Sequence, residues 1–293
     1  MTPHEFLKYT PATNCGECGY AACLAFAVAV TKGGVAADLC PYVEKAMLPA
    51  ELRGPEGEAG LDRVERGQDE RDMALVAHLK SKIQSVDFAQ LSRCVGTDWS
   101  AESPDQLRFT YLGRAIILGQ DEVVMDGQQL VDPRDQILLY NYVAFGGNAG
   151  GHAGNDEDGR AAVRLPDGSW VGMESLPNSI AKIRTLATYC EERLAERFAG
   201  RLKELALLCE KIGGEKGRDE QGQSADLAVV LPVLPYVPLY LLFWDQDLED
   251  GFEARVKILF DQHVMDFLDL ESLVFAAERL ADHLLDLDRE PSS

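Results

Sequence analysis

The sequence predicts an α+β protein made of a small, helical, cysteine-rich module and a larger α+β domain with an antiparallel sheet and long helices. Four of the seven cysteines fall within the first forty residues. β-rich runs are grouped between helical segments, which favours α+β over a regular βαβ alternation. Residues 51–71 are charged, contain glycine and carry few large apolar side chains, as is typical of a linker. We therefore expect a module over residues 1–50, a linker over 51–71 and a second domain over 72–293.

The cysteines of the module follow the pattern C-x2-C-x4-C-x16-C-P within twenty-six residues. Thiolates are the usual ligands of iron–sulfur clusters, normally four for each cubane. Gly16 and Gly19 each follow a cysteine, where the backbone must turn sharply and approach a ligand closely, and glycine does this at the lowest cost. The pattern therefore predicts a metallocluster. The four candidate ligands are Cys15, Cys18, Cys23 and Cys40.

A short helix is predicted directly after the third cysteine. Residues 24–30 are apolar and are followed by Lys32 and a pair of glycines at 33–34, which is a C-cap pattern. This helix and the turn after it would return Cys40 to the other three cysteines, and Pro41 would prevent further helix.

The run Cys-Gly-x-Cys-Gly-x-x-x-Cys-x-x-Phe-Ala, followed by Cys-Pro, resembles the Fes-type [4Fe-4S] domain. That domain is known from the large subunit of the corrinoid iron–sulfur protein and from a subunit of a membrane-bound, ferredoxin-oxidising complex. The resemblance covers roughly residues 1–50 and implies that the four cysteines bind a [4Fe-4S] cluster. Phe26 and Ala27 match as well. The remaining chain is similar to a domain-of-unknown-function family that sometimes follows this module. A role in corrinoid or one-carbon metabolism of an anaerobe is the context that the resemblance implies.

The four cysteines have two other interpretations. Structural zinc sites usually show two separated C-x2-C pairs, not three ligands in one loop, so zinc is the second hypothesis. Disulfides are the third, since residues 1–13 carry Pro3, His4 and Glu5 where a secretory signal requires a basic and then an apolar run. We therefore expect a cytoplasmic protein, in which thiols stay reduced and clustered cysteines indicate metal binding or catalysis.

The charge of the chain is strongly negative. There are 28 basic and 49 acidic residues, for a net charge of −21, and the first fifty residues hold only three lysines and four acids. An acidic second domain repels nucleic acid and anionic lipid, and it favours a partner with a basic docking face. Solubility or adaptation to salt would explain the same charge. No membrane span is expected, because Pro232, Pro235 and Pro238 interrupt the most apolar stretch.

In the second domain, apolar periodicity and turn residues predict a mixed set of elements. Asp132 as N-cap and Pro133 at the first helical position mark the start of one helix with particular clarity. The elements expected in order are a helix from Met73, strands at 107–112, 114–118 and 122–125, a helix from 133 to 145, a strand pair at 163–165 and 170–173 turning at Asp167-Gly168, a long helix at 179–212, buried strands around a proline turn at 227–244, and two or three helices between 249 and 285.

Other candidate sites are weaker. Cys190 and Cys209 lie on the apolar stripe of the long helix and Cys94 has no spaced partner, so all three are expected in the core. The glycine-rich run 146–154 follows a helix and lacks the Lys-Ser/Thr of a phosphate loop, so a surface loop is expected. The acids Asp245, Asp247, Glu249 and Asp250 could bind a cation, but capping of a helix N-terminus explains them better.

One further motif concerns a corrinoid. Asp261-Gln262-His263 matches the start of the Asp-x-His-x-x-Gly cobalamin-ligand motif, but Asp266 stands at the glycine position. The motif also lies in a predicted helix and not in a loop at the end of a strand. We therefore expect no corrinoid ligation by His263.

Three function classes follow from these observations. The first is an electron-transfer protein or redox partner in which the acidic domain docks another protein. The second is an enzyme with a substrate pocket in the second domain and the cluster as relay, and the third is a cluster-based sensor or assembly protein. No Ser-His-Asp, Cys-His or zinc-hydrolase pattern is present, so no catalytic residue is nominated.

Overall fold

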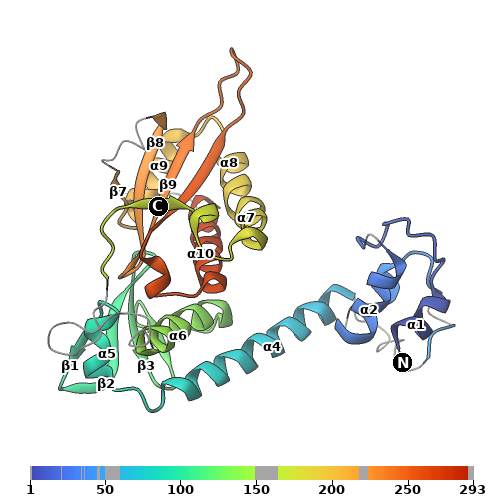
Figure 1. The fold of residues 1–293 in the computed structure, drawn as a ribbon, viewed down its shortest axis with the longest axis horizontal. Helices are drawn as coiled ribbons and strands as arrows, with labels where there is room; N and C mark the ends of the chain where they lie inside the picture. Colours follow the sequence, from blue (N-terminus) through green and yellow to red (C-terminus); the bar gives the residue numbers. More distant parts are fainter. Residues whose placement is uncertain are drawn as a thin grey trace. The chain divides into compact units, whose positions relative to one another are not determined.

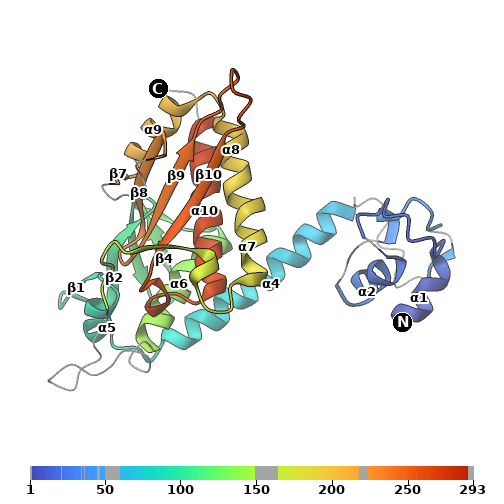
Figure 2. The ribbon, with the colours of Figure 1, turned by 45° about the horizontal axis from the view of Figure 1, so that its top comes forward.

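The computed structural model describes residues 2–20, 22–33, 35, 37–44, 47–49, 60–148, 164–217 and 224–289 (Figures 1 and 2). The chain divides into two compact units, Met1–Leu75 and Val76–Ser293. The division falls within helix α4 (Gly60–Ile83). The two units are described separately below.

The N-terminal unit is built from short helices around a small aromatic core. Helix α1 (Pro3–Phe6) opens with a capping box in which the Thr2 and Glu5 side chains each accept the other residue's backbone N–H. The helix expected after the third cysteine is confirmed as α2, which runs over Cys23–Gly33. Phe6 packs edge-on against Phe26, with ring centroids 6.0 Å apart. The other elements of this unit are the 3-10 turns η1 (Leu7–Tyr9) and η2 (Ala37–Leu39).

Helix α4 begins earlier than the sequence predicts. The expected start was Met73, but the helix starts at Gly60, so residues 60–71 of the predicted linker are helical. This segment contains three Arg, two Glu, one Gln and one Leu, which have high helix propensities, and charged composition alone does not separate a coil from a helix. Residues 51–59 lie outside the described part of the chain. The division into module, linker and domain remains a prediction.

The first half of the larger unit is an antiparallel meander with strand order β1-β2-β3-β4-β5. This confirms the predicted strands at 107–112, 114–118 and 122–125, and the helix that starts at Pro133 is also confirmed. The Asp132 carboxylate accepts the N–H of Arg134 at 2.9 Å, as an N-cap does. The elements are α5 (Phe88–Cys94), β1 (Asp98–Ser100), β2 (Ser103–Tyr111), β3 (Arg114–Gly119), β4 (Val123–Met125), β5 (Gln128–Gln129) and α6 (Pro133–Asn148).

The second half contains another antiparallel sheet, with strand order β6-β10-β9-β8-β7. Its central hairpin confirms the buried strands expected around a proline turn. Helices α8, α9 and α10 pack against this sheet (Figure 2), whose alternate side chains join the same core as the helices. The elements are β6 (Trp170–Gly172), η5 (Met173–Ser175), α7 (Ile180–Leu186), η6 (Ala187–Glu191, a π-helical turn), α8 (Glu192–Phe198), α9 (Leu202–Lys211), β7 (Glu215–Lys216), β8 (Leu227–Leu234), β9 (Val237–Trp244), β10 (Arg255–Asp261), η8 (Val264–Asp266) and α10 (Leu270–Arg289).

The strand predicted at 170–173 is confirmed as β6, but its predicted pairing with a strand at 163–165 is wrong. Arg164 and Leu165 are not in a strand, residue 163 lies outside the described part, and β6 pairs with β10. The physical cause is the buried carboxylate of Asp261, which accepts the backbone N–H groups of Asp167 and Gly168, each at 2.9 Å. This contact attaches the Asp167-Gly168 turn to the end of β10, so the turn does not close a local hairpin.

The single long helix predicted at 179–212 is also wrong. The chain is helical from Ile180 through Phe198 and again in α9, with a break between. Gly200 has a φ of +72° at the break, and its N–H donates to the Asp245 carboxylate at 2.6 Å. A glycine in the left-handed region therefore ends the helix, although the apolar stripe continues past it.

The helices expected between 249 and 285 are reduced to one long helix, α10. Residues 255–261 form the strand β10, because Val256, Ile258 and Phe260 alternate into the core with the period of two that a strand requires.

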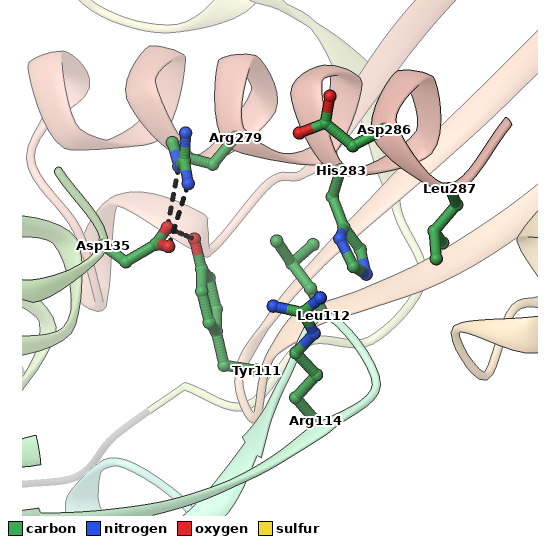
Figure 3. Close-up of a pocket in the computed structure, with 8 residues that line it drawn as sticks. All are labelled: Tyr111, Leu112, Arg114, Asp135, Arg279, His283, Asp286 and Leu287. Carbon is green, nitrogen blue, oxygen red and sulfur yellow. Dashed lines mark hydrogen bonds and ion pairs between the residues drawn. The ribbon is translucent and has the colours of Figure 1, made fainter. Parts of the chain in front are cut away.

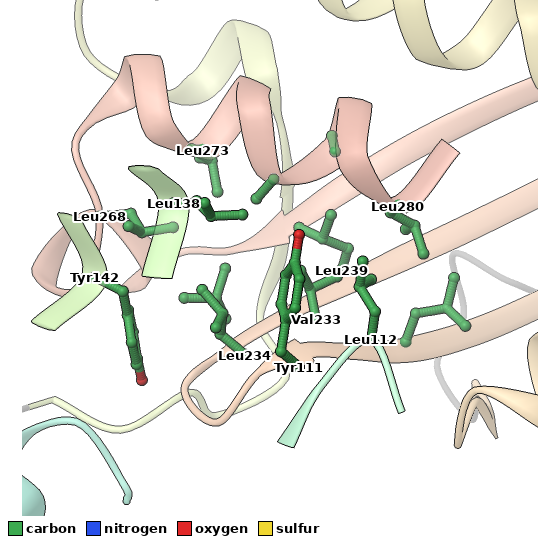
Figure 4. Close-up of a cluster of buried hydrophobic side chains, with 14 of the residues drawn as sticks. Tyr111, Leu112, Leu138, Tyr142, Val233, Leu234, Leu239, Leu268, Leu273 and Leu280 are labelled. Carbon is green, nitrogen blue, oxygen red and sulfur yellow. The ribbon is translucent and has the colours of Figure 1, made fainter. Parts of the chain in front are cut away.

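The two halves of the larger unit share one hydrophobic core. Figure 4 shows side chains from the meander, from α6, from the β8–β9 hairpin and from α10 packed together. The backbone N–H of Leu112, in the β2–β3 turn, donates to the carbonyl of Val233 on β8 at 3.1 Å. Among the described residues, no helix is long and apolar enough to cross a membrane.

The two tight turns of the meander allow a direct test of this packing. Gly113 and Gly127 have φ values of +78° and +80°, so alanine strains the backbone similarly at both sites. A Cβ at Gly113 would lie 2.9 Å from the Cα of Ile212, whereas at Gly127 nothing lies within 4 Å. We predict that Gly127→Ala lowers the free energy of unfolding by about 1–2 kcal/mol, and that Gly113→Ala lowers it by roughly a further 1–3 kcal/mol through overpacking. If urea unfolding shows the same loss of unfolding free energy for Gly113→Ala and Gly127→Ala, the close packing of the Gly113 turn against Ile212 is contradicted.

Candidate metal centre

The four cysteines of the motif lie around the N-terminal end of α2. Cys15 and Cys18 are in the loop before the helix, Cys23 is its first residue, and Cys40 directly follows η2. Cys18, Cys23 and Cys40 are 8%, 7% and 4% exposed, whereas Cys15 is exposed to solvent. The N-terminal unit therefore holds three thiols in its interior and one at its surface.

Two glycines turn the loop in the way the sequence predicts. Gly16 and Gly19 have φ values of +79° and +81°, and the N–H of Gly19 donates to the carbonyl of Gly16 at 2.9 Å. No atom lies within 4 Å of the position that a Cβ would take at either glycine. The backbone conformation thus requires glycine, and the space beside both residues is open.

Asn14 is a supporting residue that the sequence analysis missed. Its side-chain oxygen accepts the N–H of Cys23 at 2.8 Å, and its own φ is +52°. This bond satisfies one of the free N–H groups at the start of α2 and fixes the loop to the helix. A cap usually lies next to its helix, whereas Asn14 lies nine residues before Cys23, so no local pattern indicates it.

The thiols lie within electrostatic range of one another. Burial raises the pKa of Cys40, and the neighbouring thiols of Cys18, Cys15 and Cys23 raise it further, because a second thiolate near the first is unfavourable. Bound iron would offset this repulsion, since metal ions stabilise thiolates. Among the side chains that the structure describes, no three from His, Cys, Asp and Glu come close enough to hold a single metal ion.

A polar pair lies beside the loop. The hydroxyl of Tyr42 donates to the carboxylate of Glu17 at 2.9 Å, and Glu17 stands between the first two cysteines in the sequence. This contact raises the pKa of Tyr42, with smaller contributions from burial and from the thiols of Cys15 and Cys40. Tyr42 therefore keeps its proton, and a negative charge is held next to the thiol group.

The residues present fit an iron–sulfur cluster in their donor chemistry. A [4Fe-4S] cluster takes four cysteine ligands, and four free thiols lie within electrostatic range of one another, with an open, glycine-turned loop among them. Phe26 and Ala27, which also match the family pattern, are buried and contribute to packing behind the loop.

Comparisons with known proteins agree with this chemistry. Residues 11–42 match the family model described as "Putative Fe-S cluster", and residues 159–283 match a domain of unknown function, DUF3786. Over 46 residues the chain is 48% identical to the corrinoid/iron-sulfur protein large subunit of Moorella thermoacetica. That alignment covers 16% of this chain and only 10% of the relative. No solved structure matches the chain. The expected resemblance to an iron–sulfur domain followed by a domain of unknown function is confirmed, and an iron–sulfur cofactor is supported.

Two of the other three cysteines, Cys190 and Cys209, are core residues, as expected, and Cys94 is partly buried. Cys190 and Cys209 are fully buried, and burial is the main cause that raises the pKa of each thiol. Cys94 packs against the same core and contacts the carbonyl of Gln90. The buried thiols of Cys190 and Cys209 behave as small hydrophobic groups.

His263 does not lie in a helix, which corrects the prediction for the Asp-x-His motif. It follows the end of β10, and the Asp261 carboxylate of the motif is fully buried and holds the Asp167-Gly168 turn. Asp266, at the glycine position of the motif, is ion-paired with Arg164 at 2.7 Å. The absence of corrinoid ligation by His263 remains a prediction.

The acidic run after β9 lies in a loop and not at a helix N-terminus, which corrects a second prediction. Asp247 accepts the backbone N–H groups of Glu249 and Asp250, and Asp245 accepts that of Gly200. These carboxylates cap the loop and the helix break. Of the glycine-rich run 146–154, the first three residues end α6, and 149–154 lie outside the described residues.

Substitution of the cysteines tests the ligand set directly. Replacing any one of Cys15, Cys18, Cys23 or Cys40 with serine should remove or degrade the cluster, because serine replaces a thiolate ligand with a hydroxyl group that is not ionised near neutral pH. Cys94→Ala, Cys190→Ala and Cys209→Ala are the matched controls and should leave the iron content of anaerobically prepared protein unchanged. One zinc per chain with no acid-labile sulfide would contradict this ligand set.

Proposed function

We propose that this chain is a cytoplasmic iron–sulfur redox protein of an oxygen-poor cell. In this proposal Cys15, Cys18, Cys23 and Cys40 bind a [4Fe-4S] cluster, and the chain exchanges single electrons with a protein partner that has a basic docking face. The observation that carries the proposal is the unequal burial of the four thiols, three of which are interior while Cys15 is exposed.

Unequal burial is what one-electron exchange with another protein requires. A cluster, when bound, supplies a one-electron couple whose potential depends on hydrogen bonds and solvent exposure. Cys18, Cys23 and Cys40 would hold it away from water, and Cys15 would place one edge at the surface. Tyr42, which interacts electrostatically with Cys15, is 52% exposed and offers an aromatic contact for a partner at this edge.

Charge supports a basic partner. The net charge of −21 attracts positively charged surfaces at long range, and Glu17 holds a carboxylate at the thiol loop itself. The similarity to the corrinoid/iron-sulfur protein large subunit of Moorella thermoacetica supports a corrinoid or one-carbon setting for the partner.

Neutralising Glu17 should raise the reduction potential of the cluster. A negative charge near the cluster opposes the addition of an electron, and a unit charge roughly 8 Å away contributes about 0.5–2 kcal/mol for dielectric constants between 80 and 20. For one electron this corresponds to about 20–90 mV. We therefore predict that Glu17→Gln shifts the midpoint potential upward by this amount in a spectroelectrochemical titration.

Tyr42→Phe is the matched control for that shift. It removes the hydroxyl that donates to Glu17 but leaves the carboxylate charge in place, so it should not produce the upward shift. An unchanged potential in Glu17→Gln, or the same upward shift in both variants, would show that the charge of Glu17 does not act on the cluster.

The sign of the field around the cluster can be tested with two small reductants. Stopped-flow reduction by a cationic donor, reduced methyl viologen, should slow as ionic strength rises from about 10 mM, because salt shortens the Debye length from about 30 Å. Reduction by the anionic donor dithionite should show the opposite salt dependence. Rates that are indifferent to salt, or a cluster that neither donor reduces, would contradict the electron-transfer role and favour a structural or sensing role.

A further inference from the structure

The larger unit contains a cavity of about 200 Å³ between the β2–β3 turn, α6 and α10 (Figure 3). It lies within Val76–Ser293 and involves none of the cysteines. The side chains that matter for its chemistry are Tyr111, Arg114, Asp135, Arg279 and His283.

One wall of the cavity is a buried carboxylate whose hydrogen bonds are already made. Asp135 accepts the hydroxyl of Tyr111 at 2.7 Å, and Arg279 donates to it with Nε at 2.7 Å and Nη2 at 2.8 Å. Burial, followed by the charge of Asp135, raises the pKa of Tyr111 well above its usual range, so Tyr111 keeps its proton. Arg279 also contacts Asp132 and Asp282. This network therefore fixes the wall and leaves Arg279 with little capacity for a ligand.

The opposite wall carries a cation without a carboxylate partner. Arg114 is the first residue of β3, and within the described chain its recorded side-chain contact is the sulfur of Met125, at 3.8 Å. Asp286, at the rim of the cavity, is paired with Arg289 at 3.1 Å. The guanidinium of Arg114 is thus the available positive charge at this cavity, in a chain that is otherwise strongly acidic.

His283 faces the same space as Arg114 (Figure 3). Burial, followed by the nearby charge of Arg114, lowers the pKa of His283 to about 4, with a smaller lowering by Arg279 and opposing effects of Asp135 and Asp286. The imidazole is therefore neutral at neutral pH and can donate one N–H and accept one hydrogen bond. No protein partner of the ring is recorded within the described residues.

The turn that carries Arg114 is held rigidly. Leu112 has a φ of +49°, which is unusual for a bulky side chain, and Gly113 is pressed against Ile212. The N–H of Leu112 is bonded to Val233. Strained, over-determined backbone of this kind is concentrated at ligand sites, and here it positions a guanidinium over a cavity.

We propose that this cavity binds a small oxyanion, a carboxylate or phosphate group on a body of no more than a few carbon atoms. Arg114 pairs with two of its oxygens through the planar fork of the guanidinium, and His283 donates an N–H to it. A volume of about 200 Å³ is the volume that roughly seven molecules occupy in liquid water. It is smaller than the 300–1,000 Å³ typical of sites for larger ligands. Nucleotides, flavins and corrinoids are therefore too large for it.

The test is a titration of the full chain, prepared anaerobically, with inorganic phosphate, acetate and succinate, and with glycerol as a neutral control. Binding is followed by calorimetry and by the NMR resonances of the His283 ring. We expect saturable binding of at least one of the three anions with a shift of the His283 signals, and no response to glycerol. The anion that binds distinguishes a phosphate site from a carboxylate site.

Variants of Arg114 make the test specific. Arg114→Gln should weaken binding at least tenfold, because charge-assisted hydrogen bonds are lost. The affinity of Arg114→Lys, which keeps the charge but not the planar fork, should lie between those of the unmodified chain and Arg114→Gln. Arg108→Gln is the matched control, since Arg108 is an exposed arginine on the adjacent strand β2 and is bonded to Gln106.

The unmodified chain decides the proposal even if the Arg114 variants are unstable. No saturable binding of phosphate, acetate or succinate by that chain would overturn it. Equal weakening by Arg114→Gln and Arg108→Gln in folded protein, judged by circular dichroism, would overturn it as well. Neither outcome depends on the presence of the cluster or on electron transfer.

Discussion

The conformation of the N-terminal unit depends on bringing three thiols within nine residues to one end of a helix, and a fourth back to them. The loop meets this constraint with two left-handed glycines, Gly16 and Gly19, and with the Asn14 side chain bonded to the first N–H of α2. The aromatic core behind the loop is small, so metal ligation would add to the stability of this unit as it does in other small metal-binding domains. The same constraint explains the unequal burial, since three thiols face the interior of the unit and Cys15 remains at the surface.

The larger unit depends on a different polar interaction. Asp135 on α6 joins Tyr111 on β2 to Arg279 on α10 and so connects the meander with the second half of the unit. Removing one partner of such a buried pair usually costs more than the pair contributes, because the other charge is left unpaired. Holding these elements together also leaves a cavity beside them, with Arg114 and His283 on its surface. The chain thus has two chemically distinct candidate sites, a group of thiols in one unit and a cavity lined by Arg114 and His283 in the other.

What could be predicted from the sequence was local. The cysteine spacing, the helix after Cys23, the meander and the helix capped by Asp132 all have signals within a few residues, and each is present in the structure. The errors came from long-range contacts: Asp261 fixes a turn almost a hundred residues away in the chain, and Gly200 ends a helix whose apolar stripe continues. The cavity could not be predicted, because Arg114 and His283 are far apart in sequence and neither belongs to a motif. The hydrogen bond between Tyr42 and Glu17 was missed because the two residues lie 25 positions apart in the sequence.

The most direct test of the account is an anaerobic reductive titration of the full chain followed by electron paramagnetic resonance, with iron and acid-labile sulfide determined on the same sample. If the four cysteines hold one [4Fe-4S] cluster that exchanges electrons, the protein should contain about four irons and four sulfides per chain. Its signal should grow to about one unpaired electron per chain and disappear on reoxidation. A single zinc ion per chain with no sulfide, or an iron centre that never accepts an electron, would contradict the account.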